Sequence, residues 1–304
     1  MAAMIPDSQV KITTSSYGKT GVKLLYVRRQ GDWHDITEYE VSTLLELNDH
    51  KDYIRGDNSS VVPTDTQKNT VYVVAQKYGV GCPEVFAMTL CRHFLSTYSH
   101  VVSARVRVET VNGWTRMTKE GSQHRHAFIS SPKCTRYAEV FQKRNRDPEV
   151  AAGLSGLRVL KTTQSSFVDF HRCPNTTLPD AEDRILSTVI SAEWKYSDLT
   201  GVDYCATWEL VQDAILDTFA GPPVTGIASP SVQLTLYDSE RLVLGKVKQI
   251  SEMKMSLPNV HYFEFDMGRF HNPALQNTKN VFLPTDKPSG IIQATLRRNQ
   301  LSKL

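Results

Sequence analysis

The 304-residue sequence lacks the features that define several large protein classes. Its longest apolar stretches, such as Val71–Ala75, fall far short of the roughly 18 residues that a membrane-spanning helix requires. With 16 glycines and 14 prolines, the chain is neither collagen-like nor of low complexity. Its 35 Lys and Arg residues nearly balance its 32 Asp and Glu residues, and no basic block is present to bind nucleic acid. The sequence therefore predicts a globular protein that binds neither membranes nor nucleic acids, and whose partner is a small molecule or another protein.

Cysteine pairs of the kind found in disulfide frameworks and zinc sites are also missing. The first ten residues show no secretory signal, so we expect the thiols to be reduced. The five cysteines are irregularly spaced and form no CxxC pair: Cys82, Cys91, Cys134, Cys173 and Cys205.

Motifs for nucleotide binding and serine hydrolysis are absent as well. The sequence has no GxGxxG or GxxxxGK loop and no GxSxG elbow. His124 and His126 form the one close histidine pair, and their i, i+2 spacing on a strand points both rings to one side, as two metal ligands would require. Because no third ligand has a matching spacing, we expect a polar strand face and no metal.

Periodic patterns divide the first half of the chain into strands and helices. Thr64 and Gln67 fit a capping box that opens a helix reaching residue 78, and Pro83 opens a second helix reaching residue 98. A glycine-containing turn is expected at 17–21. Alternating apolar and polar residues predict strands at 10–14, 22–27, 39–47, 102–108, 127–130 and 137–141.

The second half repeats this order. Asp203 caps a helix that ends at Gly221, a second helix opens at Ser229 and Pro230 and runs to about residue 247, and strands are expected at 157–163, 186–196, 261–267 and 291–296. We therefore predict an α+β protein made of two antiparallel ββααββ units, in residues 1–148 and 149–304. Because such units leave a sheet face and strand edges uncovered, the pattern also predicts an oligomer.

Several short stretches are more specific than ordinary loops. They read VVPTDTQKNT at 61–70, DRILST at 183–188, SPSVQ at 229–233 and LPNVHYF at 257–263. Together with the turn at Tyr17, Gly18 and Lys19 and the segment LKTTQSSF that ends at Phe167, they closely resemble the urate oxidase (uricase) family. The resemblance covers essentially the whole chain, in order and at compatible spacing.

The resemblance implies a fold, an assembly and a reaction. Each chain would contain two tunnelling-fold (T-fold) units, two chains would complete a barrel of antiparallel strands, and two barrels would stack into a homotetramer. Urate would be oxidised by O₂ to 5-hydroxyisourate with release of H₂O₂, a step of purine catabolism, without a metal or an organic cofactor.

The resemblance also implies how urate is bound. Urate is a flat anion with hydrogen-bond donors and acceptors along its edges. Arg184 would supply a bidentate cation and Gln233 the complementary amide. Phe167 would supply a stacking ring, and the main-chain N–H of Val232, near a helix start, would be a further donor.

The remaining implied residues concern catalysis and the far edge of the ligand. Thr64 and the backbone of Asp65, from a neighbouring chain, would meet that edge, so the site would cross a subunit interface. Lys19 and Thr64 would relay a proton, with His261 behind them, and Asn259 with Thr64 would frame the position of O₂. A lysine in a largely buried pocket has its neutral form favoured, which would let Lys19 draw the threonine proton.

The end of the sequence carries a targeting motif. A terminal Ser302-Lys303-Leu304 tripeptide is an address read by the peroxisomal import receptor. We therefore expect a peroxisomal protein, which suits an oxidase that produces peroxide.

Two alternatives remain open. A purine or pterin enzyme of the same fold would use a bound metal, with His124 and His126 as ligands, and would lose activity on chelation. A homologue that binds purine without oxidising it would depart from the family among six positions, all of which match here: Lys19, Thr64, Arg184, Gln233, Asn259 and His261.

Overall fold

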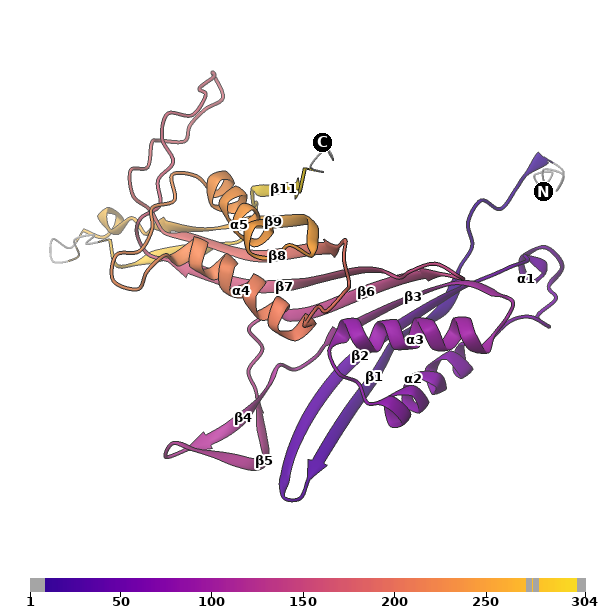
Figure 1. Cartoon of the computed structure of the whole chain (residues 1–304). Helices are drawn as coiled ribbons and strands as arrows, with labels where there is room; N and C mark the ends of the chain where they lie inside the picture. The colour runs from indigo at the N-terminus through magenta and orange to yellow at the C-terminus, as the bar shows by residue number, and fades with distance from the viewer. Residues whose placement is uncertain (1–8, 272–274, 276–278, 300–304) are drawn as a thin grey trace, which may run out of the picture. The chain divides into compact units, whose positions relative to one another are not determined.

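The computed structural model describes residues 9–271, 275 and 279–299, and the chain separates into two compact α+β units (Figure 1). The first unit contains residues up to Pro132 and Arg136–Ala152; the second contains Lys133–Thr135 and the chain from Gly153 onward. The tripeptide Ser302-Lys303-Leu304 lies outside the described residues. None of the described helices combines the length and apolar character needed to span a bilayer.

The first unit is an antiparallel sheet in the order β1-β2-β3-β6, with a separate β4-β5 hairpin. In the C-terminal part of β2, every second side chain is buried. Helices α2 and α3 pack beside each other on the sheet (Figure 1). The elements are β1 (Tyr17–Gln30), β2 (Trp33–Leu47), α1 (Lys51–Arg55), α2 (Thr64–Tyr78), α3 (Pro83–Thr97), β3 (Val101–Thr110), β4 (Trp114–Lys119), β5 (Ser122–Ser130) and β6 (Thr135–Lys143).

The second unit is also an antiparallel sheet, with β9 beside β8 and with β10 and β11 each pairing a different part of β9. Helices α4 and α5 pack against each other, and α5 contacts β9 and β11 (Figure 1). The elements are β7 (Glu149–Lys161), β8 (Leu186–Tyr196), α4 (Tyr204–Ala220), α5 (Val232–Lys246), β9 (Ile250–Glu264), η2 (Met267–Arg269), β10 (Phe282–Thr285) and β11 (Ile291–Arg297).

The glycines near the start of the chain have a different role from the predicted turn. Residues 10–16 form no strand, so the strand predicted at 10–14 is wrong, and β1 begins at Tyr17, inside the predicted turn. A Cβ atom on Gly18 would come within 1.7 Å of the Thr43 carbonyl oxygen, so only glycine allows this close strand approach. Gly21, with φ +67°, lies at a register shift between Lys19 and Val22. The glycines permit a tight, bulged strand pairing.

The predicted capping box at the start of α2 does not form. Thr64 is the first helical residue, Pro63 is at the N-cap position, and no side chain caps this end. Gln67 turns into the core instead, where its amide oxygen accepts a hydrogen bond from Thr43 Oγ1 at 2.8 Å and its amide nitrogen donates to the Val62 carbonyl at 3.3 Å. The buried Thr43 hydroxyl needs a hydrogen-bond partner. Gln67 stabilises the fold more by supplying that partner than by capping an exposed helix end. Thr64 is left exposed.

Other boundaries follow the local chemistry. Asp203 caps α4 as predicted, accepting from the amides of Cys205 and Ala206 at 3.1 and 3.0 Å. Helix α5 begins at Val232, later than predicted, because the Ser231 hydroxyl caps it. Strand β9 ends at Glu264, so the predicted strand does not reach residue 267, where η2 begins. The sequence patterns missed the short elements α1, β4 and β10.

The cysteines differ from the expected set of reduced thiols. Cys91, Cys134 and Cys173 are free. Cys82 and Cys205 are disulfide-bonded, so the expectation is wrong for these two.

A buried acid in α5 makes the stability of the second unit depend on pH. Glu240 is fully buried, neither of its carboxyl oxygens has a hydrogen-bond partner among the described residues, and burial raises its pKa to about 7 against a smaller opposing effect of the Met255 backbone. The unfolded chain releases this proton near its ordinary pKa of about 4.5, whereas the folded chain holds it until about pH 7. Stability is therefore lost as pH rises through that window.

Glu240→Gln is expected to raise the free energy of unfolding by about 3 kcal/mol at pH 8 to 9. The difference shrinks toward pH 5, where the wild-type carboxyl is largely neutral in the fold. Urea unfolding across this pH range measures it, with Glu149→Gln, at the exposed first residue of β7, as the matched control. A difference that does not change with pH would contradict the account.

Candidate functional site

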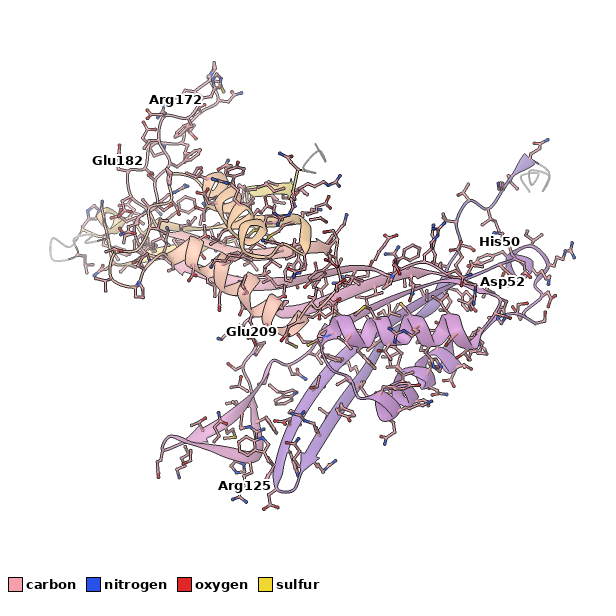
Figure 2. The ribbon with its side chains drawn as sticks, viewed as in Figure 1. His50, Asp52, Arg125, Arg172, Glu182 and Glu209 are labelled. Carbon is pink, nitrogen blue, oxygen red and sulfur yellow. The ribbon has the colours of Figure 1, made fainter. Side chains whose placement is uncertain are left out.

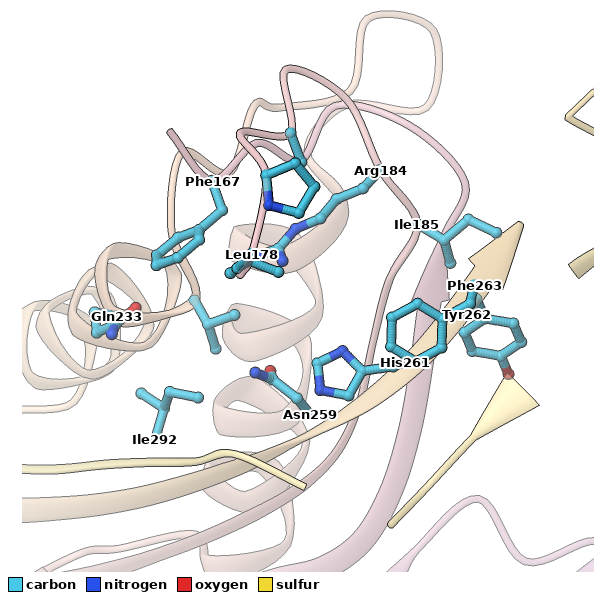
Figure 3. Close-up of a pocket in the computed structure, with 13 residues that line it drawn as sticks. Phe167, Leu178, Arg184, Ile185, Gln233, Asn259, His261, Tyr262, Phe263 and Ile292 are labelled. Carbon is cyan, nitrogen blue, oxygen red and sulfur yellow. The ribbon is translucent and has the colours of Figure 1, made fainter. Parts of the chain in front are cut away.

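A pocket of about 520 Å³ opens in the second unit, among the β7–β8 connection, the start of α5, and strands β9 and β11 (Figure 3). Polar side chains from different elements face its common space, and the rest of its lining is largely apolar. This combination is typical of a site for a flat organic ligand. The lining residues are Phe167, Leu178, Pro179, Ala181, Arg184, Ile185, Val232, Gln233, Asn259, His261, Tyr262, Phe263 and Ile292.

Backbone pairing in the β7–β8 connection brings Phe167 and Arg184 together. The Phe167 amide donates to the Ala181 carbonyl at 2.8 Å, and the Ala181 amide donates back at 3.0 Å. The Arg184 amide donates to the Ser165 carbonyl, also at 2.8 Å. As a result, the guanidinium carbon lies 5.3 Å from the centre of the Phe167 ring. An aromatic face and a fixed cation thus border the same space.

Arg184 has no countercharge of its own. No carboxylate in the described ranges forms an ion pair with it, and its buried Nε has no hydrogen-bond partner there. The neighbouring Asp183 is engaged elsewhere: it accepts from Thr163 Oγ1 at 2.6 Å, and this bond lowers the pKa of Asp183. Burial lowers the pKa of Arg184, yet a guanidinium stays charged at any physiological pH. A half-buried cation without an acid partner predicts an anionic ligand.

The start of α5 adds a second favourable feature for an anion. The Ser231 hydroxyl caps the helix by accepting from the Leu234 amide at 3.1 Å. The amide of Val232 therefore belongs to the first turn, where N–H groups lack partners inside the helix and carry a partial positive charge. The exposed Gln233 follows at the pocket wall (Figure 3).

Strand β9 supplies the opposite wall. Asn259 and His261 are two residues apart and therefore point to the same face (Figure 3). The Asn259 backbone is held on both sides: its amide donates to the Gly290 carbonyl at 2.8 Å, and its carbonyl accepts from the Ser289 hydroxyl at 2.6 Å. The His261 ring stacks on Phe263, with ring centres 5.6 Å apart. An amide and an imidazole are thus fixed side by side.

The β7–β8 connection forms a projecting loop that carries Arg172 and Glu182 (Figure 2). The loop is braced by an ion pair of 2.8 Å between Arg172 and Asp180. Phe170 does not line the pocket but stacks on Phe167, with ring centres 4.9 Å apart and the rings nearly parallel. The loop therefore supports the aromatic wall of the pocket.

The apolar lining is what the sequence did not predict. Tyr262 and Phe263 stand inside the distinctive LPNVHYF stretch, which was a usable signal. Ile185 stands in the distinctive DRILST stretch in the same way. The other lining residues carry no chemical signal and join the site only through the fold: Leu178, Pro179, Ala181 and Ile292.

Three predicted site residues lie in the first unit and do not line this pocket. Lys19 is half-buried on β1, opposite Thr43, so the large burial expected for it is not found in the single chain. Thr64 and Asp65 open α2 and are exposed. An ion pair with Lys68 lowers the pKa of Asp65, and the charge of Lys19 adds a smaller effect. The structure thus gathers the other six predicted residues in one pocket and these three in a separate cluster.

The histidine pair on β5 has the predicted arrangement. The rings of His124 and His126 lie 4.7 Å apart between centres, and His124 Nδ1 accepts from the His126 amide at 3.3 Å. Within the described residues, no group of three or more His, Cys, Asp or Glu side chains is placed to hold a metal ion. No described residue set therefore supports a metal site built from these histidines.

Comparison with known proteins gives one consistent result. The family model described as Uricase matches residues 15–141 and 150–293. The uricase of Oryctolagus cuniculus is 45% identical over 304 residues, covering 100% of both chains. The uricase of Drosophila subobscura is 46% identical, covering 97% of this chain and 93% of its own. The crystal structure of uricase from Arthrobacter globiformis matches with a TM-score of 0.86 and 35% identity, covering 95% of each chain.

Proposed function

The chain belongs to the uricase family and is an oxidoreductase that oxidises urate, and from this premise we propose that the pocket of the second unit binds the urate. The observation that carries the proposal is the guanidinium of Arg184, which has no acid partner among the described residues, beside the Phe167 ring. A planar anion fits this pair, because it can stack on the ring while its edge meets the guanidinium.

The proposed binding mode uses each polar wall once. Arg184 donates two parallel hydrogen bonds to one edge of urate. Gln233 offers a donor and an acceptor to the complementary edge, and the Val232 N–H donates from the start of α5. Phe167 stacks on the ring, and its position is supported from behind by Phe170.

The proposed site is completed by a neighbouring chain. We propose that residues 1–148 and 149–304 each form a T-fold unit, that two chains close a barrel of antiparallel strands, and that two barrels stack into a homotetramer. The helices lie on the sheet in each unit, and the pocket contains none of the first-unit residues Lys19, Thr64 and Asp65. In the assembly, Thr64 and the Asp65 backbone of one chain meet the far edge of urate bound to another.

Mixing two impaired variants, at a urate concentration that Arg184→Ala binds poorly, tests the shared site. Chains with Thr64→Ala and chains with Arg184→Ala are co-expressed, so that some sites combine the intact Thr64 of one chain with the intact Arg184 of the other. In a random equal mixture, roughly a quarter of the sites are then restored, and urate oxidation returns above the level of either variant alone. Activity that stays at the level of the single variants would place both residues in one chain's site and contradict the proposal.

The proposed chemistry consists of proton removal and placement of oxygen. Urate loses two electrons, O₂ takes two electrons and two protons to become H₂O₂, and water supplies the hydroxyl group of 5-hydroxyisourate. Lys19 draws a proton through Thr64, with His261 behind them, which leaves urate electron-rich enough to transfer an electron to O₂ directly. Asn259 and Thr64 hold O₂ or water over the ring. The protein residues thus supply positioning and proton transfer without a cofactor.

Two observations bear on the alternatives. A metal-dependent purine enzyme would need His124 and His126 in a larger ligand set, and the described residues around them form none. A purine-binding protein without turnover would need a change at a proposed catalytic position, yet Lys19, Thr64 and His261 all match the family pattern.

We further propose that the protein acts in the peroxisome. Ser302-Lys303-Leu304 has the sequence of a peroxisomal address, and the proposed product H₂O₂ suits that compartment. A fluorescent fusion that ends in this tripeptide should enter peroxisomes, and the same fusion without it should stay outside. Equal import of both would contradict the assignment.

A further inference from the structure

Lys161, at the end of β7, does not line the pocket and takes no part in the binding mode described above. Its ammonium donates to the Ile227 carbonyl and to the Ser229 hydroxyl, each at 2.8 Å. It also faces the Phe219 ring, 5.5 Å from the ring centre. Both hydrogen-bond acceptors belong to the segment that leads into α5.

The environment of Lys161 is unusual for a lysine. The side chain is half-buried, and no carboxylate of the described residues forms an ion pair with it. Desolvation lowers the pKa of its ammonium. Burying a lysine without an acid partner costs free energy. The hydrogen bonds from Lys161 to the segment 227–229 offset that cost.

Ser229 is the point where two walls of the pocket are joined. Its amide donates to the Gln164 carbonyl at 2.8 Å, and its carbonyl accepts from the Ser166 amide at 3.0 Å. Its hydroxyl accepts from Lys161 and also from Thr235 Oγ1, at 2.8 Å in each case. The segment before Phe167 and the first turn of α5 are therefore tied together through one residue.

These hydrogen bonds also connect Ser229 to the residues proposed to bind urate. Arg184 is held by its amide on the Ser165 carbonyl, next to the residues that pair with Ser229. Val232 and Gln233 follow Ser229 by three and four residues, at the start of α5. The position of Ser229 thus sets the spacing between the Arg184–Phe167 wall and the α5 wall.

We propose that Lys161 is a positioning residue for urate: through its ammonium it fixes Ser229, and through Ser229 it sets the distance between the walls that bind the two edges of the purine. The proposal rests on the proposed function, because it concerns the same pocket. Lys161 acts from behind the walls, so it affects substrate binding more than the proton relay of Lys19 and Thr64.

The test compares Lys161→Met, which keeps an unbranched side chain but removes its charge and donors, with Lys161→Arg, which keeps charge and donors. Lys248→Met, in the exposed turn after α5, is the matched control. The readouts are KM and kcat for urate, the Kd for urate measured without oxygen, and the unfolding temperature. Binding without oxygen is read separately from turnover because oxidation cannot then proceed.

Lys161→Met is expected to raise KM and the oxygen-free Kd by about 10- to 100-fold, with a much smaller change in kcat, since displacing binding groups by about 1 Å has effects of this size. Lys161→Arg should recover most of the loss, and Lys248→Met should match wild type. A purely structural lysine would lower the unfolding temperature without moving KM, and that result would overturn the proposal.

Arg184→Ala, measured in parallel, separates this inference from the proposed function. If Arg184→Ala weakens urate binding while Lys161→Met leaves KM unchanged, the pocket is the urate site and only the role of Lys161 is wrong. If Arg184→Ala leaves urate binding unchanged, the pocket itself is not the site, and both proposals are wrong.

Discussion

Replacing Arg184 with alanine is expected to weaken urate binding by about 100-fold or more, because two charge-assisted hydrogen bonds of about 1.5–3 kcal/mol each are lost. The guanidinium has no carboxylate partner among the described residues, so its removal breaks no ion pair in the fold. The loss should therefore appear in KM and in the oxygen-free Kd, and the unfolding temperature should change little.

Two further variants sharpen this result. Arg184→Lys keeps the charge but not the two-pronged geometry, and it should recover only part of the affinity. Arg158→Ala, an exposed arginine on β7, is the matched control and should bind urate like wild type. Unchanged urate binding by Arg184→Ala would show that the anion is recognised elsewhere.

Replacing Lys19 with methionine, or Thr64 with alanine, is expected to lower kcat and to change urate binding little, the reverse of the effect of Arg184→Ala. Each change removes a member of the proposed proton relay, so kcat should fall by about 100-fold or more, the usual scale for a lost general base. The oxygen-free Kd for urate should change far less, because the principal binding groups lie in the other unit.

The exposed Lys23, on the same strand as Lys19, provides the control. Lys23→Met should keep the wild-type kcat. Wild-type turnover by Lys19→Met would remove the relay from the account, whereas parallel losses in kcat and affinity would show that Lys19 binds the substrate and does not act as a base.

The parts of the fold that were predictable have strong local signals. Strand β8 has the predicted bounds, because every second side chain from Leu186 to Tyr196 is buried. Asp203 caps α4 as predicted, because a cap depends only on backbone amides two and three residues further along the chain. Gly18 and Gln67 were misassigned because their roles depend on Thr43, which lies more than twenty residues away in each case. Local patterns do not carry such contacts.

The candidate site divides in the same way. Arg184, Asn259 and His261 belong to distinctive stretches of sequence, and the fold brings them to one pocket. Leu178 and Ile292 line it without any sequence signal, because an apolar wall is defined by its neighbours alone. Lys161 stands in the distinctive segment LKTTQSSF but received no role, since its acceptors on Ile227 and Ser229 are known only once β7 and the α5 segment are placed.

The most direct test of the central claim is a turnover assay after exhaustive chelation. The purified protein is mixed with urate in air, and the near-ultraviolet band of urate is followed together with H₂O₂. The account predicts that the band disappears while one peroxide forms for each urate consumed, at a rate that added metal does not change. Persistence of the urate band, or its loss only after metal is restored, would contradict it.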